Sequence, residues 1–198
     1  MALIVRPSAV LELGETTLVF EGLGATQGMA RTDRQLWSRA ASLLEKRSVE
    51  GRRVLELGAG ATGALGLAAK VRGASAVTVT DLPVAMEVLA ENVRRNAAYA
   101  PGVHAKSLDW TDPELPDWAR RNFDLIVAGD CLFGDSIDAF HRTLAALLDA
   151  NPNSRALVFN QSNKGLFAFY NKLRKKHYEQ VKLQTTTHHD FYCLHIIP

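Results

Sequence analysis

A glycine-rich segment, GAGATG at residues 58–63, joins the apolar run 53–57 to a helix-forming segment at 64–71. Glycines at such a position let the backbone approach a ligand, and the first amides of the following helix point toward it. The same pattern also occurs in tight strand-to-helix turns that bind nothing. We favour a ligand site, because the segment follows the first strand of a predicted parallel set.

Asp81 ends the next predicted strand, where a carboxylate can accept hydrogen bonds from the two hydroxyls of a ribose. It could instead cap the helix that begins at Pro83. These features do not separate S-adenosylmethionine (SAM) from NAD, because both carry a ribose and an adenine. A dehydrogenase normally needs further structure to hold its substrate, whereas here we expect the chain to end with one complete sheet. This favours SAM.

Strands and helices alternate along most of the chain, which is typical of an α/β fold. Strands are expected at 53–57, 76–80, 103–108, 123–128, 156–160, 178–184 and 191–197, and helices at 36–50, 64–71, 83–99, 137–150 and 165–176. This spacing predicts a mainly parallel sheet, helices on both faces, and a ligand at the carboxyl ends of the strands. No helix separates the last two strands, so we expect an antiparallel pair with a turn near His188.

The segment before residue 33 is expected to be a separate N-terminal extension. Two short β-prone runs, 9–13 and 17–21, flank Gly14-Glu15 and predict a β-hairpin. We therefore expect a hairpin extension in residues 1–32 and one α/β domain in residues 33–198.

The composition indicates a single core with no strong charge preference. Of 198 residues, 47% are apolar and the formal net charge is +2, so we expect neither nucleic acid nor a membrane as partner. Two cysteines, without metal-site spacing, predict reduced thiols and no metal. Because we find no apolar run of about 18 residues and no signal-peptide core, we expect a cytoplasmic protein that can also enter the nucleus. We expect it to be a monomer.

Five motifs occur in order: VLELGAG at 54–60, VTVTD at 77–81, ENVRRN at 91–96, LDW at 108–110 and FDLIVAGDCLF at 123–133. Together they resemble the seven-strand protein lysine methyltransferase family, which includes enzymes that act on Hsp70-type chaperones and on valosin-containing protein. The resemblance covers about residues 33–160. It implies a Rossmann-like class I methyltransferase fold with a seven-stranded, mainly parallel sheet, an antiparallel last strand and SAM as cofactor.

The resemblance also implies which residues contact SAM. The glycine loop would surround the methionine portion, Glu56 would steady that loop, Asp81 would bind the ribose, and two tryptophans would line the adenine pocket. Read without the resemblance, each tryptophan would be interpreted as a core residue. At Ala61-Thr62 the glycine loop is one residue longer than the loop that family members commonly have. The implied cofactor residues are Trp37, Glu56, Gly58, Ala59, Gly60, Asp81, Trp110 and Gly129, the last leaving room for adenine.

Asp130 and Phe133 match the family's Asp-x-x-Phe/Tyr signature after the fourth strand and are the predicted catalytic residues. Asp130 would orient a neutral lysine ε-amine and stabilise the charge that develops on its nitrogen, and Phe133 would offer an aromatic wall to the cation. Asp130 could instead cap the following helix. We do not expect Cys131 to act as a nucleophile, because no Pro-Cys pair accompanies it.

A protein lysine is the predicted methyl acceptor. Arginine, histidine or a small-molecule amine is the alternative acceptor, since only the acceptor pocket would differ. A non-catalytic SAM-binding module or scaffold is a further alternative from another class. Nucleic acid is disfavoured as substrate, because no Asn-Pro-Pro-Tyr type sequence follows the fourth strand.

Overall fold

The structure is a computed structural model that describes residues 9–20, 44, 49–120, 122–132, 134–160, 163–173, 180–185 and 192–197. Two predicted site residues, Trp37 and Phe133, lie outside the described residues. The same holds for most of the helix expected at 36–50, of which Leu44 is described as helical and buried.

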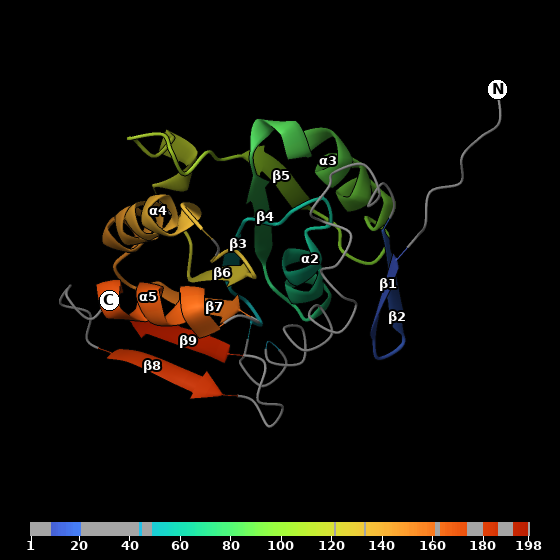
Figure 1. Ribbon diagram of the computed structural model, residues 1–198. Helices are drawn as coiled ribbons and strands as arrows, with labels where there is room; N and C mark the ends of the chain where they lie inside the picture. The colour runs from blue at the N-terminus through green and yellow to red at the C-terminus, as the bar shows by residue number, and fades with distance from the viewer. Residues whose placement is uncertain are drawn as a thin grey trace.

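Seven strands form one sheet in the order β5-β4-β3-β6-β7-β9-β8 (Figure 1). The pairs from β5 to β7 are parallel, whereas β9 runs antiparallel to both β7 and β8. The predicted mainly parallel sheet with an antiparallel last strand is therefore confirmed. The strands are β3 (Arg53–Leu57), β4 (Ala76–Asp81), β5 (Val103–Ser107), β6 (Leu125–Gly129), β7 (Arg155–Asn160), β8 (Gln180–Thr185) and β9 (Tyr192–Ile197).

The strand order reverses beside β3, because β4 and β5 lie on one side of it and β6 and β7 on the other. In open α/β sheets the crevice at such a reversal point, at the carboxyl ends of the strands, is the usual ligand site. The glycine loop leaves the carboxyl end of β3, and Asp81 and Asp130 end or follow β4 and β6. The topology thus brings the predicted site residues to one edge.

Helices cover both faces of the sheet, as predicted. Because side chains alternate along a strand, Val54 packs under α2 (Ala64–Val71) and α3 (Met86–Arg95), while Leu55 packs under α4 (Ser136–Ala150) and α5 (Asn163–Leu173). Figure 1 shows α4 and α5 together on one side of the sheet. Two hydrophobic clusters therefore fix the sheet between helix layers.

The helix predicted at 83–99 is shorter in the structure. A 3₁₀ turn, η1 (Pro83–Ala85), precedes α3, which ends at Arg95. The chain then turns through residues 96–102, where the Tyr99 and Ala100 amides both donate to the Asn96 carbonyl, before β5 begins at Val103. A second 3₁₀ turn, η2 (Asp117–Ala119), follows β5.

The predicted hairpin is present as β1 (Ala9–Leu13) and β2 (Thr16–Phe20), paired antiparallel with Leu11 opposite Leu18. Leu11, Leu18 and Phe20 are buried in the same cluster as the α2 and α3 side chains. The hairpin therefore shares the core of the α/β domain. The expected boundary between residues 32 and 33 lies outside the described residues.

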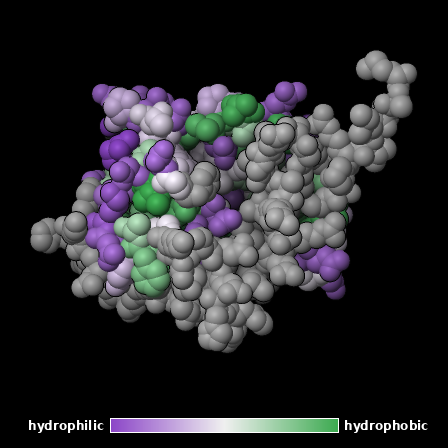
Figure 2. Space-filling view, in the orientation of Figure 1, coloured by the Kyte–Doolittle hydropathy of each residue, from purple (hydrophilic) through white to green (hydrophobic). Residues whose placement is uncertain are grey.

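On the face shown in Figure 2, hydrophobic residues form small areas among hydrophilic ones. The most exposed large apolar side chain of the described chain is Val84, which follows β4. Within the described segments, no helix has the length and hydropathy that a membrane-spanning helix requires.

Candidate active site

The glycine loop is a single closed turn between β3 and α2. Gly58, Gly60 and Gly63 have φ values of 65°, 60° and 60°, a left-handed conformation that favours glycine. The Gly63 amide donates to the Ala59 carbonyl at 3.0 Å, and the Ala59 amide donates to the Thr80 carbonyl of β4 at 2.9 Å. The longer stretch at Ala61-Thr62 is therefore absorbed within this turn.

Asp81 lies directly against the loop. Its Oδ2 accepts a hydrogen bond from the Gly60 amide at 2.7 Å, and its Oδ1 accepts one from the Leu82 amide at 2.8 Å. Each carboxylate oxygen has two lone pairs, so this half-buried group can accept further bonds from a ligand. Asp81 does not cap the helix that follows, because the N-cap residue of η1 is Leu82.

Glu56 stabilises the beginning of α2. Its side chain is only 3% exposed and accepts a hydrogen bond from the Gly66 amide at 2.8 Å. Burial raises the pKa of Glu56 to about 7, and the negative charge of Asp81 also raises it, against the backbone hydrogen bonds from Gly66 and Leu65. Glu56 is thus hydrogen-bonded to the first turn of α2, the helix that follows the loop.

Asp130 has an unusual backbone conformation for a residue with a side chain. Its φ is 55°, in a region that costs free energy for most L-residues and that often marks functional sites. Its amide donates to the Phe159 carbonyl at 2.8 Å, which extends the pairing of β6 and β7 by one residue. The N-cap residue of α4 is Asp135, so Asp130 does not cap that helix.

The residues after Asp130 are also held by specific contacts. The Leu132 amide donates to Asn160 Oδ1 at 3.3 Å, and Ser136 Oγ donates to the Cys131 carbonyl at 3.1 Å. These bonds link the segment to the end of β7 and to the first turn of α4. The backbone at Asp130 is therefore fixed from both neighbouring elements.

Cys131 is buried between the ends of β3 and β6. Its thiol lies 3.4 Å from the Leu57 carbonyl oxygen and 3.3 Å from that of Gly129. Burial raises the pKa of this thiol far above its usual range, and nearby acidic groups raise it further. A buried, protonated thiol is a poor nucleophile, which argues against a catalytic role for Cys131.

Trp110 follows β5 and reaches the start of the glycine loop. A Cβ atom added at Gly58 would lie 3.0 Å from Trp110 Cη2 and 2.6 Å from Cys131 Sγ. The indole packs edge-on against Phe140, with 5.0 Å between ring centroids. Its Nε1 is buried and has no hydrogen-bond partner among the described residues. Such a donor is typical of a place where a ligand or a water molecule supplies the acceptor.

Gly129 serves close packing on one side. An added Cβ would lie 2.9 Å from Cδ1 of Leu65 in α2. The space beside Gly129 on that face is therefore filled by a core side chain, and a ligand can approach only from elsewhere.

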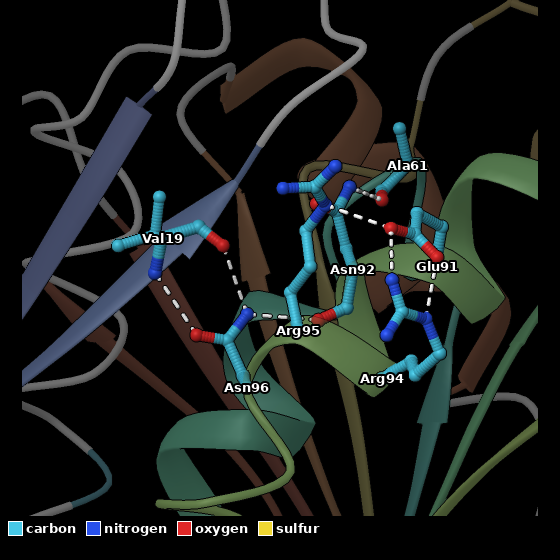
Figure 3. Close-up of polar contacts among 7 residues, drawn as sticks. All are labelled: Val19, Ala61, Glu91, Asn92, Arg94, Arg95 and Asn96. Carbon is cyan, nitrogen blue, oxygen red and sulfur yellow. Dashed lines mark hydrogen bonds and ion pairs between the residues drawn. The ribbon is translucent and has the colours of Figure 1, made fainter.

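Two buried asparagines, Asn92 within α3 and Asn96 at its C-cap, have no role in the sequence analysis and link the loop to the hairpin (Figure 3). Asn92 Nδ2 donates to the Ala61 carbonyl at 2.7 Å, and Asn96 Nδ2 donates to the Asn92 carbonyl at 2.8 Å. Asparagine is a poor helix former, so Asn92 inside α3 was the available signal of a tertiary role. Their partners are not readable from the sequence.

The structure thus brings together the glycine loop, Asp81, Glu56, Trp110 and Asp130 at the carboxyl ends of adjacent strands. Among the described residues, no group of three or more metal-ligating side chains occurs. This sheet order, with a glycine loop after β3 and an acidic residue ending β4, defines a Rossmann-like methyltransferase fold.

Solved structures agree with that fold. The 16S rRNA N2 G1207 methyltransferase of T. Thermophilus, solved with AdoMet and guanosine, aligns with a TM-score of 0.70 at 21% identity, covering 98% of this chain and 50% of that one. The ribosomal protein L11 methylase of Lactobacillus delbrueckii subsp. bulgaricus aligns with a TM-score of 0.60 at 22% identity, covering 83% and 79%. At these identities the similarity concerns the fold alone.

Residues 26–176 match the lysine methyltransferase family, and the chain belongs to it. "EEF1A lysine methyltransferase 3" of Mus musculus is 34% identical over 128 residues, which are 61% of this chain and 51% of that protein. "Protein N-lysine methyltransferase METTL21A" of Mus musculus is 36% identical over 124 residues, 59% of this chain and 56% of that protein. The matched region spans about half the length of these relatives.

Proposed function

We propose that this protein is a SAM-dependent methyltransferase that transfers a methyl group to the ε-amine of a lysine in a protein substrate. The observation that carries the proposal is the contact between the Gly60 amide and Asp81, which joins the ends of β3 and β4; Asp130 follows β6, the other neighbour of β3. Membership of the lysine methyltransferase family supports the acceptor chemistry.

The residues of this site fit SAM. Gly58 and Gly60 carry no side chain of their own and have a positive φ, which suits a turn that approaches the methionine portion, and Asp81 has acceptor capacity for the ribose hydroxyls. The unpaired indole N–H of Trp110 suits a polar ligand atom. We assign Trp37, Trp110 and Gly129 to the adenine side of the pocket.

Acidic groups around the loop favour a cationic ligand. Asp81 is close enough to Glu56 for its negative charge to raise the pKa of the Glu56 carboxyl group. When bound, SAM supplies a methyl group on a positively charged sulfonium. These carboxylates would attract that charge, and a cation near Glu56 would favour its ionised form.

We assign Asp130 as the group that orients the acceptor amine. Its conformation at φ 55° is enforced by its bond to Phe159 and by the fixed segment after it. In this proposal its carboxylate accepts a hydrogen bond from the neutral ε-amine, directs the nitrogen lone pair and stabilises the positive charge that the nitrogen acquires. The proton of the lysine ammonium is lost to water beforehand, so no strong base is needed. We also propose that Phe133 offers an aromatic wall to the cation.

A protein substrate is supported by the names of the relatives. They include a calmodulin-lysine N-methyltransferase of Arabidopsis thaliana, 35% identical over 118 residues, and the EEF1A enzyme already described. We take a lysine in a folded protein as the acceptor for this chain.

The test is incubation of the purified protein with methyl-labelled SAM and a cell extract, followed by mass spectrometry of labelled proteins. Label on lysine that disappears in Asp130→Asn supports the proposal. Label on arginine, histidine or a small-molecule amine would assign the alternative acceptor. Binding of SAM without any label would favour a non-catalytic module, and the absence of binding would overturn the cofactor assignment.

A further inference from the structure

We infer that the N-terminal hairpin is a positioning element for the glycine loop, and that Asn96 and Asn92 transmit its position to the loop carbonyl of Ala61. The hydrogen-bonded chain from Val19 through Asn96 and Asn92 to Ala61 is called the asparagine link. Its effect on cofactor affinity rests on the proposed function, whereas its effect on the order of the loop does not.

The first half of the link joins β2 to α3. The Val19 amide donates to Asn96 Oδ1 at 2.9 Å, and Asn96 Nδ2 donates to the Val19 carbonyl at 2.9 Å (Figure 3). The side-chain amide of Asn96 therefore pairs with both backbone groups of one residue, as a neighbouring strand would. It occupies the side of β2 that β1 does not cover.

The second half joins α3 to the loop. Asn96 Nδ2 also donates to the Asn92 carbonyl, and Asn92 Nδ2 donates to the Ala61 carbonyl. Asn92 and Asn96 are each 1% exposed, so water cannot replace these bonds without a rearrangement. The hairpin is also anchored by Leu18 and Phe20, which are fully buried in the hydrophobic cluster that includes α2 and α3 side chains.

The end point of the link explains its proposed consequence. Ala61 follows Gly60, whose amide is bound to Asp81. Two successive loop residues are thus held by side chains: the Gly60 amide by Asp81 and the Ala61 carbonyl by Asn92. Loss of the bond from Asn92 would free the Ala61 carbonyl and widen the range of positions of the Gly60 amide. The cofactor would then have to order the loop on binding, which lowers affinity.

The experiment measures two quantities in the full chain, hydrogen exchange of the amides at residues 59–63 and the Kd of the demethylated product of SAM by calorimetry. The variants are Asn92→Leu, Asn96→Ser, Asn96→Asp and the double variant Asn92→Leu/Asn96→Ser. Asn96→Asp keeps an acceptor for the Val19 amide but removes the donor. The matched control is Glu91→Gln on the same helix, because Glu91 pairs with Arg94 and Arg95 at the surface.

We expect Asn92→Leu and Asn96→Ser each to raise exchange at 59–63 and to raise Kd by about tenfold, as for the loss of one buried hydrogen bond. The double variant should be little worse than Asn92→Leu, because both changes break one link. Glu91→Gln should leave both quantities unchanged.

A merely structural role predicts a different result, a lower melting temperature with unchanged exchange at 59–63 and unchanged Kd well below that temperature. That result, or fully additive effects in the double variant, would overturn the inference. If the wild type fails to bind the SAM product, the proposed function falls, while the exchange data still decide whether the hairpin orders the loop. Asn96→Asp serves where Asn96→Ser does not fold.

Discussion

Asp81 Oδ2 lies 2.7 Å from the backbone nitrogen of Gly60, so the acidic residue that ends β4 is hydrogen-bonded to the loop that follows β3. The two residues come from neighbouring parallel strands whose carboxyl ends meet at the reversal point of the sheet. One carboxylate can therefore set the shape of the loop and still face a ligand.

Replacement of Asp81 by alanine should weaken SAM binding by about 10- to 100-fold, the usual effect of losing hydrogen bonds to a charged group. The change removes a ribose acceptor and also leaves the Gly60 amide without its partner. Calorimetry with SAM measures the effect. Asp124→Ala is the control, because Asp124 accepts a similar bond from the Arg53 amide at the opposite end of β3. Equal loss of affinity in both variants would contradict a direct role for Asp81.

Asp130→Asn should lower the rate of methyl transfer by about 100-fold and leave the Kd for SAM nearly unchanged. Asparagine tolerates the positive φ at this position, so the backbone should be preserved while the negative charge is lost. Single-turnover kinetics together with calorimetry separate the two effects. Asp130→Gly relieves the backbone strain and should also be inactive, though no less stable than the wild type. A transfer rate close to that of the wild type in either variant would exclude Asp130 as the orienting group.

Much of the fold and part of the site could be predicted from the sequence. The apolar strands and glycine positions determine where β3 ends, and the rule that ligands bind at carboxyl ends then leads to Asp81 and Asp130. The asparagine link could not be predicted in this way. Asn96 binds Val19, which lies 77 residues away in the chain, and no local pattern reveals such a partner.

The packing around Gly58 and Gly129 also could not be predicted from the sequence. Both are predicted to contact the cofactor, and the structure adds that the position of a Cβ atom at each is occupied by neighbouring side chains, those of Cys131 and Trp110 at Gly58 and that of Leu65 at Gly129. The sequence indicates that a turn such as the one at Gly58 needs glycine. Only the three-dimensional contacts show which neighbouring atoms would clash with a side chain there.

Glu56 should make the stability of the protein depend on pH. Its pKa of about 7 in the folded protein lies above the ordinary 4.5, so between these pH values the folded protein holds a proton that the unfolded chain has lost. The free energy of unfolding should therefore fall as the pH rises from about 4.5 to about 7, by on the order of 3 kcal/mol, and level off above that range.

Urea unfolding of wild type and Glu56→Gln at pH 5 and pH 8 measures this contribution. Glutamine keeps an oxygen acceptor for the Gly66 amide but does not ionise. The free energy of unfolding of the variant should therefore change much less between pH 5 and pH 8 than that of the wild type. Glu87→Gln, a change of an exposed glutamate, should behave as the wild type does. An unchanged pH dependence in Glu56→Gln would show that other groups cause it.

Gly58→Ala should destabilise the protein and weaken SAM binding for two separable reasons. The φ of 65° is unfavourable for alanine by about 1–2 kcal/mol, and the new Cβ would lie 2.6 Å from Cys131 Sγ and 3.0 Å from the Trp110 ring. In the double variant Gly58→Ala/Cys131→Ala the sulfur is gone, so part of the loss from the clash should be recovered while the loss from the backbone remains.

Cys131→Ala alone should keep methyl transfer, because the thiol is buried and protonated. Chemical denaturation and SAM titration of the four proteins complete the cycle. Strict additivity would mean that the contact with Cys131 contributes nothing, and inactivity of Cys131→Ala would require a role for the thiol that its burial argues against.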